Sequence, residues 1–453
     1  MSKDSGASAL RGAAREVHLP GDEGYDQARS TWSLGADLHP AAVVFATSAD
    51  EISAVVRTAA AEGLRVSAMG TGHNAHPFND LDRTVMLRTS RMNGFSIDAD
   101  KRSARTSAGT LWLPVVEGAA GHGLSALHGS APDVSVAGFT VGGGVGFYSR
   151  EYGLASSHVT AAELVLADGT QVRVDANQEP DLFWAVRGGG GSFGIVTALE
   201  FGLVPHDTAY AGFLAWDLSQ APEVFARWLE WTASAPTALT TTYRHLRFPP
   251  IPQLPEPFRG RNLVMIDGAV LGDDALAART LAPLRELKPV MDTFGRVPSP
   301  AVARLHMDPE EPTNGETTDR LLDALPAAAV DRLMAVSGPD SGSTVFTTEV
   351  RHFGGALGRP ASSAGALTHL DAQYMVQSAG AVFDPAQKPA VVAEIHGIVD
   401  AMSEWSRDRV YLNFAQEQGT TSRAFDSATW QRLLSIREKV DPNGVLRPNH
   451  EVV

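Results

Sequence analysis

Hydrophobic residues in the N-terminal part of the chain alternate between short continuous runs and helical spacing. Runs at 41–46, 64–68 and 84–87 have the length of buried strands. Between the first two runs, behind a capping box that starts at Ser48, apolar residues recur at helical spacing: Ile52, Val55, Val56 and Ala59. The pattern predicts a strand–helix–strand unit whose second strand ends in the loop 69–74.

The next part of the chain reads as hairpins and short helices. Alternating arms around polar turns predict hairpins over 95–108 and 159–174, and helical spacing predicts helices over 111–120 and 181–187. The segment 129–146 is rich in Gly but also contains Val and Phe, so it is too apolar for a solvated linker. It predicts backbone packed closely against a large flat ligand.

Beyond Pro205 the pattern changes to strands interleaved with amphipathic helices. Strands are predicted at 239–248, 262–271, 343–353 and 372–378, and helices at 221–233, 273–286, 318–335 and 387–404. This order indicates a sheet with helices on one face. A strand with two aromatic residues at 410–414 and a helix over 430–440 follow. The whole pattern predicts an α+β fold.

Composition narrows the range of partners. The 453 residues are enough for two or three domains, and the net charge of −15 argues against nucleic acid, which needs a basic surface. No apolar run is long enough for a membrane span, and the first residues lack a signal-peptide core, so we expect a cytoplasmic protein that does not bind membranes. The absence of Cys excludes disulfides, thiolate catalysis and Cys-ligated metals.

The loop 69–74 is the strongest candidate for chemistry. Its small residues let backbone N–H groups approach a phosphate closely, which indicates a cradle for a pyrophosphate. The loop also holds one nucleophilic side chain, His73, which is either a covalent attachment point or a hydrogen-bond partner of phosphate or backbone. The spacing of His73 and His76 suits a metal pair, but no Cys or carboxylate cluster lies nearby, and we predict no metal site.

A second glycine run has the spacing of a dinucleotide-binding motif. Gly189, Gly191 and Gly194 form the spacing G-x-G-x-x-G. A dinucleotide fold needs a strand before this motif and a helix after it, whereas here the predicted helix comes first and a strand follows. The order excludes NAD binding by this run.

Five segments in order carry a resemblance to a known family. They are Gly72-His73, Gly142–Gly146, Gly191–Thr197, Tyr411–Phe414 and Asp441–Asn449. The chain resembles the p-cresol methylhydroxylase/vanillyl-alcohol-oxidase superfamily of FAD enzymes, and within it the berberine-bridge-enzyme-like oxidases. The resemblance implies a two-part FAD-binding domain (1–205 with 405–453) and an inserted antiparallel-sheet substrate domain (206–404) backed by helices, with the flavin ring at their interface.

The resemblance also implies the residues that hold FAD. They are Gly70, Thr71, Gly72, His73, Asn74, Gly129, Ser130, Val134, Ser135, Gly138, Gly142, Gly143, Gly146, Val196, Tyr411 and Asn413. The sequence departs from relatives at Met69, where they usually have Arg, at Thr71, where they have Gly, and at Ala131, where many have a Cys that binds the flavin a second time. FAD is therefore held covalently through His73 alone, or without a covalent bond.

Tyr411 is the first candidate for the catalytic base, because several relatives use a Tyr at the flavin face. Strand alternation would place Asn413 on the same face, within reach of flavin or substrate. The competing interpretation of Tyr411 is an aromatic residue of the core, the commoner fate of Tyr in a sheet.

Two further sets of side chains are candidates on the predicted sheet. Glu349 and Arg351 share a strand face; an ion pair is the favoured interpretation, and substrate contact is the alternative. Tyr374 and Tyr243 are weaker candidates, and Glu349 and Tyr374 are the next candidates for the base if Tyr411 does not take the proton.

The reaction that the resemblance implies is an oxidation in two halves. A base removes a proton from an alcohol, phenol or amine, hydride passes to the flavin, and dioxygen reoxidises it to give hydrogen peroxide. In plant relatives the position that matches Val134 tunes oxygen access, and Val there accompanies oxidase behaviour. A dehydrogenase with a quinone or protein acceptor, an oxidative cyclase and a flavin carrier are the alternatives. The substrate and the oligomeric state are left open.

Overall fold

The N-terminal sheet of the computed structural model, which describes residue 6 and residues 8–453, has the order β1-β2-β4-β3. Its strands are β1 (Val17–His18), β2 (Ala42–Phe45), β3 (Arg65–Met69) and β4 (Thr84–Arg88), the last three parallel. Helix α3 (Ala49–Ala61) joins β2 to β3, and its N-cap Ser48 accepts a hydrogen bond from the Glu51 amide. The predicted strand–helix–strand unit is confirmed.

A five-stranded antiparallel sheet follows, in the order β5-β6-β9-β7-β8. Its strands are β5 (Phe95–Asp98), β6 (Ser103–Ser107), β7 (Val159–Val165), β8 (Gln171–Asp175) and β9 (Ile195–Gly202). Both predicted hairpins are therefore confirmed. Helices of this part are α2 (Tyr25–Arg29), α4 (Trp112–Ala120), α5 (Val136–Val141), α6 (Ser149–Tyr152) and α7 (Pro180–Val186).

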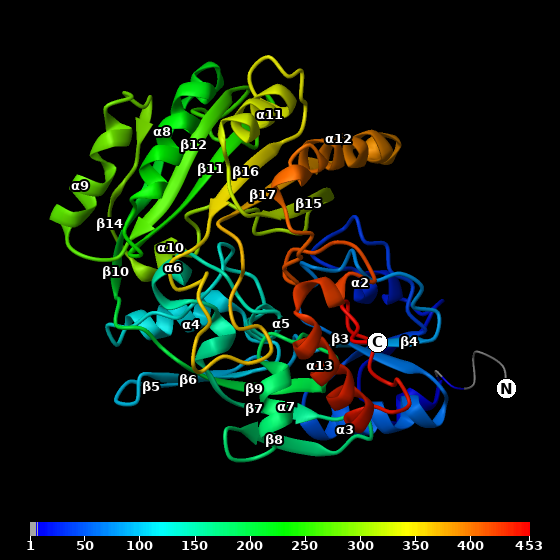
Figure 1. Cartoon of the computed structure of the whole chain (residues 1–453). Helices are drawn as coiled ribbons and strands as arrows, with labels where there is room; N and C mark the ends of the chain where they lie inside the picture. The colour runs from blue at the N-terminus through cyan, green and yellow to red at the C-terminus, as the bar shows by residue number, and fades with distance from the viewer. Residues whose placement is uncertain (1–5, 7) are drawn as a thin grey trace.

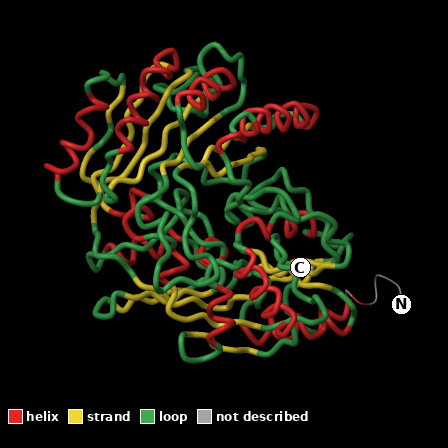
Figure 2. The backbone as a smooth tube through the Cα atoms, viewed as in Figure 1, coloured by secondary structure: helices red, strands yellow, loops and turns green. Residues whose placement is uncertain are grey.

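The largest sheet lies in the upper half of Figure 1, with the order β13-β10-β12-β11-β16-β17-β15, and β14 also pairs with β10. The strands are β10 (Thr208–Asp217), β11 (Leu239–Arg247), β12 (Asn262–Val270), β13 (Met291–Asp292), β14 (Gly295–Pro298), β15 (Gly315–Leu322), β16 (Thr347–His352) and β17 (Tyr374–Ala381). The outer face is covered by α8 (Ala221–Ala233), α9 (Asp274–Arg285), α11 (Ala327–Ser337) and α12 (Lys388–Asp400), while α10 (Ser299–Val302) lies beside α4. An antiparallel sheet backed by helices is confirmed (Figure 2).

Alternation along these strands separates an apolar face from a polar one. Tyr243, Val350 and Val376 pack with the helices in one buried cluster. Because successive side chains of a strand point to opposite faces, Arg244 and Glu349 point away from the helices, toward the other two sheets. The register pairs Arg244 with Glu349 across β11 and β16, so these polar side chains stand next to each other.

The C-terminal segment returns to the N-terminal sheet. Helix α13 (Ser427–Val440) begins after its N-cap Asp426 and ends before Asp441, whose carboxylate accepts hydrogen bonds from the amides of Val445 and Leu446, both at 2.7 Å. The following tail lies along β3, where the Val66 amide donates to the Val445 carbonyl and the Arg447 amide to the Val66 carbonyl. The C-terminal tail thus pairs with strand β3 of the N-terminal sheet, while domain boundaries at 205 and 405 stay predictions.

Two predictions of local structure were wrong, and two elements were missed. The helix expected over 318–335 is strand β15 followed by helix α11, because the amphipathic stretch 315–322 pairs with β17 at the sheet edge. The strand expected over 410–414 is a turn, in which the amides of Phe414 and Ala415 both donate to the Tyr411 carbonyl. Strand β10 and the short helix α5 were not predicted.

None of the helices in the described part of the chain is both long and apolar enough to cross a membrane.

Candidate functional site

A cavity of about 520 Å³ lies between the polar face of the largest sheet and the loops of the other two sheets. Its wall combines the loop after β3, the glycine-rich segment around α5, the polar face of β11, β16 and β17, and the C-terminal tail. The segments that carry the family resemblance therefore meet at one place, although they are far apart in the sequence.

The loop after β3 requires glycine at two positions. Gly72 has a φ of +86°, and a Cβ there would lie 2.6 Å from the Cβ of Thr31. A Cβ on Gly70 would lie 2.8 Å from the Cβ of Ser135. The loop backbone thus packs tightly against two neighbouring segments, and its other side borders the cavity. This is the geometry expected of a backbone cradle for phosphate.

His73 is held on three sides. Its ring is stacked on Trp32, with centroids 4.1 Å apart and an interplanar angle of 16°. Its Nδ1 lies 2.7 Å from Thr71 Oγ1, and its Nε2 lies 3.3 Å from Asp133 Oδ1. The imidazole therefore has a fixed orientation at the cavity wall.

Several buried polar atoms around the cavity have no hydrogen-bond partner within the protein. Asn74 and Asn413 each donate through Nδ2 to a backbone carbonyl, of Leu412 and Phe139 respectively, both at 2.8 Å. Their Oδ1 atoms are left without partners, as is Gln416 Oε1, which also lines the cavity. Such atoms are costly to bury unpaired, so they indicate a polar ligand that satisfies them. The ring edge, ribityl chain and pyrophosphate of FAD fit these requirements.

A network of buried charges forms the opposite wall. His306 lies between two carboxylates, with Nδ1 2.8 Å from Asp267 Oδ2 and Nε2 2.9 Å from Glu349 Oε2. Glu349 Oε1 in turn lies 2.6 Å from Arg351 Nε, and Arg244 Nε lies 3.6 Å from Glu349 Oε2. Four members of this network, all except Asp267, line the cavity.

The network fixes the charges of its members. Burial and Arg244 favour neutral His306, but Asp267, Glu349 and Asp308 outweigh them and raise the pKa of His306 to about 9. Burial favours neutral Glu349, but Arg351 and His306 outweigh it and hold the pKa of that carboxyl well below its usual range. At neutral pH the site therefore holds an imidazolium and an ionised Glu349.

Glu349 and Arg351 form the expected ion pair and also face the cavity. The guanidinium carbon of Arg351 lies 4.9 Å from the ring centroid of Phe414, which also lines the cavity. The two residues thus form the ion pair that the sequence favoured, and they also border the cavity, as the alternative of substrate contact requires.

Tyr411 lies elsewhere than expected. Because residues 411–414 form a turn, the alternation argument that put Tyr411 and Asn413 on one face is wrong. Asn413 lines the cavity, whereas the Tyr411 ring is fully buried in the core beside Gly143 and is absent from the cavity wall. Burial raises the pKa of the Tyr411 phenol far above its usual value, which opposes a role as base at neutral pH. Its catalytic role stays a prediction without its geometric support.

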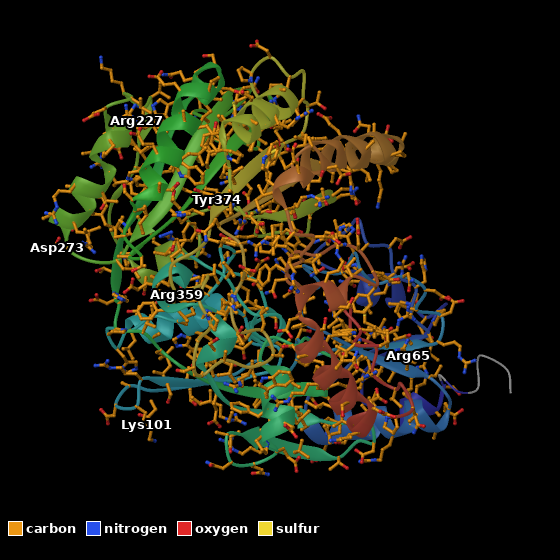
Figure 3. All side chains as sticks on the ribbon, in the orientation of Figure 1. Arg65, Lys101, Arg227, Asp273, Arg359 and Tyr374 are labelled. Carbon is orange, nitrogen blue, oxygen red and sulfur yellow. The ribbon has the colours of Figure 1, made fainter. Side chains whose placement is uncertain are left out.

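Tyr374, labelled in Figure 3, also points away from the cavity. It lies on β17 on the side of the helices, where its hydroxyl is 3.3 Å from Thr232 Oγ1 and its ring stacks on His352. Tyr243 is buried in the same layer. Both residues therefore pack between the sheet and its helices and do not border the cavity.

Thirteen of the sixteen residues predicted to hold FAD line the cavity. They are Gly70, Thr71, Gly72, His73, Asn74, Gly129, Ser130, Val134, Ser135, Gly138, Gly142, Val196 and Asn413. Gly143, Gly146 and Tyr411 do not; a Cβ on Gly146 would overlap the His128 carbonyl oxygen, so this glycine serves backbone packing. Sequence reasoning missed Trp32, Asp133, His306 and His450, which stand in no motif or periodic pattern.

Comparisons with known proteins agree with this geometry. A family described as "FAD binding domain" matches residues 40–175. The (R)-6-hydroxynicotine oxidase of Paenarthrobacter nicotinovorans is 28% identical over 459 residues, 96% of each chain. The chitooligosaccharide oxidase of Gibberella zeae is 24% identical over 471 residues, 97% of this chain and 92% of the relative.

Solved structures share the fold. The crystal structure of 6-hydroxy-D-nicotine oxidase from Arthrobacter nicotinovorans superposes with a TM-score of 0.81 at 25% identity, covering 95% of this chain and 96% of that one. Berberine bridge enzyme from Eschscholzia californica gives a TM-score of 0.83 at 19% identity, covering 100% and 99%. The chain is thus an FAD-linked oxidoreductase with an FAD-binding domain and the fold of berberine bridge enzyme, and it is similar to oxidases of the p-cresol methylhydroxylase/vanillyl-alcohol-oxidase superfamily.

Proposed function

We propose that the protein is an oxidase that removes hydride from an alcohol, phenolic or amine carbon of a small molecule and passes the electrons to dioxygen. One observation supports the proposal most strongly. The loop after β3, which has the geometry of a phosphate-binding loop and contains His73, borders the same cavity as the buried charged residues of the largest sheet. Relatives named as oxidases of a hydroxynicotine and of chitooligosaccharides support the same class.

FAD, when bound, would accept the hydride and return the electrons to dioxygen. The backbone of 70–73 would hold its pyrophosphate, and the unpaired Oδ1 atoms of Asn74 and Asn413 would accept hydrogen bonds from it. His73 would form the covalent bond. Ala131 lies in the same wall and offers no second attachment.

Glu349 and Arg351 would contact the substrate. Ionised Glu349 accepts hydrogen bonds, so it would orient a substrate O–H or N–H group, and Arg351 would stabilise negative charge that develops on the substrate oxygen. Both Glu349 oxygens are already held by cations, so this carboxylate is a weak base. Its role is to orient the substrate. The variants Tyr411→Phe and Glu349→Gln test which group accepts the proton.

Which electron acceptor reoxidises the flavin depends on the space that the cavity wall leaves beside the flavin ring. Val134 lines the cavity between Ala131 and helix α5, where a small side chain would leave room for dioxygen beside a bound flavin. This supports an oxidase over a dehydrogenase with a larger acceptor. An oxidative cyclase would use the same residues and differ only in the substrate.

The test is a substrate screen with the purified holoenzyme. Alcohols, sugars, cyclic amines and phenolic natural products are added without oxygen, and bleaching of the flavin absorbance identifies those that reduce it. Admission of air should restore the absorbance and produce one hydrogen peroxide per substrate oxidised. Bleaching that air does not reverse, but a quinone does, would identify a dehydrogenase.

A further inference from the structure

The carboxylate of Asp133 lies next to the imidazole of His73, the nucleophilic side chain at the cavity wall. Its Oδ1 lies 3.3 Å from Nε2 of His73, an ion-pair distance, and neither of these two buried atoms has a hydrogen-bond partner in the protein. On the other side of the ring, Thr71 Oγ1 lies 2.7 Å from Nδ1. Trp32 covers one ring face, so the imidazole is not free to turn over.

These partners decide which nitrogen carries the proton. The negative charge of a carboxylate 3.3 Å away favours a proton on the nearer nitrogen, so Nε2 is the nitrogen that carries N–H. In neutral imidazole the other nitrogen then has the lone pair, and the Thr71 hydroxyl donates to it. The arrangement therefore selects the tautomer with a proton on Nε2 and a nucleophilic Nδ1.

The two sides of the ring also differ in what they face. Thr71 and His73 line the cavity, whereas Asp133 does not. The lone pair on Nδ1 therefore lies on the side of the ring that faces Thr71, a residue of the cavity wall. The proton on Nε2 lies on the side of a carboxylate outside the wall.

We propose that Asp133 is a positioning residue for covalent flavin attachment: it holds the proton on Nε2 of His73, so that Nδ1 forms the bond. The inference rests on the covalent link given under Proposed function. It assigns a role to Asp133, to Thr71 as the donor that keeps Nδ1 unprotonated, and to Trp32 as the surface that fixes the ring.

The step balances with dioxygen as the oxidant. A C–H bond of a methyl group on the flavin ring breaks, and a C–N bond to Nδ1 forms. The electron pair of the broken C–H bond remains on the flavin, which is reduced, and the Nε2 proton moves toward Asp133. One hydrogen from the methyl group and one from the imidazole finally leave with dioxygen as hydrogen peroxide. The Asp133 carboxylate compensates the positive charge that develops on the ring as Nδ1 is alkylated.

The place of Asp133 in the chain fits this role. It lies two residues after Ala131, which lines the cavity. The same segment brings a carboxylate to His73.

The experiment measures attachment itself. Full-length protein is purified from riboflavin-starved cells, mixed with FAD in air, and sampled over time. Acid-precipitated pellets are assayed for retained flavin, and the labelled peptide is identified by mass spectrometry. Asp133→Asn keeps the size of the side chain and removes its charge, and Asp181→Asn is the matched control, since Asp181 pairs with Arg432 on the surface and lies outside the cavity wall.

We expect Asp133→Asn to bind FAD with the occupancy of wild type but to attach it at least about tenfold more slowly. Asp133→Glu should recover part of the rate, and Asp181→Asn should attach at the wild-type rate. Equal rates for Asp133→Asn and wild type would overturn the inference while leaving the covalent link intact. Loss of FAD occupancy in Asp133→Asn would overturn it too, because the carboxylate would then act on binding. Wild type without covalent flavin would instead overturn the link itself, and the inference with it.

Discussion

His306 donates from Nε2 to Glu349 Oε2 across 2.9 Å, at a point where the loop after α10 meets strand β16. The same ring donates from Nδ1 to Asp267 at 2.8 Å. Because both ring nitrogens face carboxylates, the imidazole must carry both protons. A permanent cation thus lies beside the carboxylate that faces the substrate.

This contact predicts a pH dependence of stability. The pKa of His306 in the folded protein is about 9, above its usual value of 6.5. Its contribution to the free energy of unfolding is therefore complete below about pH 6.5 and is lost as the pH rises through about 9. The groups that face it are Asp267, Glu349, Asp308 and Arg244. Thermal melts between pH 6 and pH 10 should show a falling midpoint, and His306→Gln should flatten that slope while lowering the midpoint at pH 6. An unchanged slope in the variant would assign the loss to other groups.

Substitution Glu349→Gln tests the charged wall. The amide keeps the size of the side chain but leaves His306 and Arg351 without their shared anion. Removal of one partner from a buried ion pair typically costs about 3–5 kcal/mol, so a clear drop in thermal stability is expected. Flavin reduction by substrate should also slow, whereas FAD content should hold. Tyr374→Phe is the control, since that hydroxyl lies on the helix side of the sheet; a similar loss of rate there would contradict the placement of the substrate.

Tyr411→Phe decides between the two interpretations of this residue. The ring is fully buried outside the cavity wall, so removal of the hydroxyl should change flavin reduction less than about tenfold and leave FAD content unchanged. Rapid-reaction spectroscopy of the reductive half-reaction measures this. A loss of about 10²–10⁴ would restore Tyr411 as the base and require a path from the cavity to its hydroxyl.

Local patterns predicted much of the fold because they act over short distances. The helix α3 with its Ser48 cap, both hairpins of the second sheet and helix α8 follow from periodicity and turn chemistry alone. The pairing of 315–322 with β17 is a long-range contact, and a polar edge strand has the same amphipathic pattern as a helix. The order of strands in the largest sheet has no local signature at all.

The site divides in the same way. Glycines of the loop after β3 were predicted because close backbone packing needs glycine wherever it occurs. His306 was missed, since a single His becomes an imidazolium only when folding brings Asp267 and Glu349 to its two nitrogens. Tyr411 was misplaced because two aromatic residues in a short apolar run are typical of a strand, whereas tertiary contacts turn the backbone there.

Substitution Val134→Leu tests access of dioxygen. Leu adds one methylene to a wall position close to Ala131, where it would fill space that dioxygen needs. Stopped-flow mixing of reduced enzyme with oxygen should show slower reoxidation, while anaerobic reduction by substrate stays nearly unchanged. Val196→Leu adds the same methylene elsewhere on the wall and serves as the control. Equal reoxidation in Val134→Leu and wild type would place the oxygen path elsewhere.

Three glycines test where the flavin lies without knowledge of the substrate. A Cβ on Gly138, at the cavity wall in helix α5, would meet no protein atom within 4 Å, and the same is true of Gly397 in helix α12. A Cβ on Gly142 would overlap the Oδ1 of Asn413.

Gly138→Ala should therefore fold with at least wild-type stability, because Ala favours a helix by about 1 kcal/mol over Gly. If FAD packs against this wall, however, the added methyl group weakens its binding, so flavin content and retention during gel filtration should fall. Gly397→Ala gains the same helix propensity far from the cavity and should keep its flavin. Gly142→Ala should lose both flavin and thermal stability, since Asn413 must move. Wild-type FAD affinity in Gly138→Ala would show that the flavin does not lie against α5, and the assignment of the glycine-rich segment to the cofactor would fail.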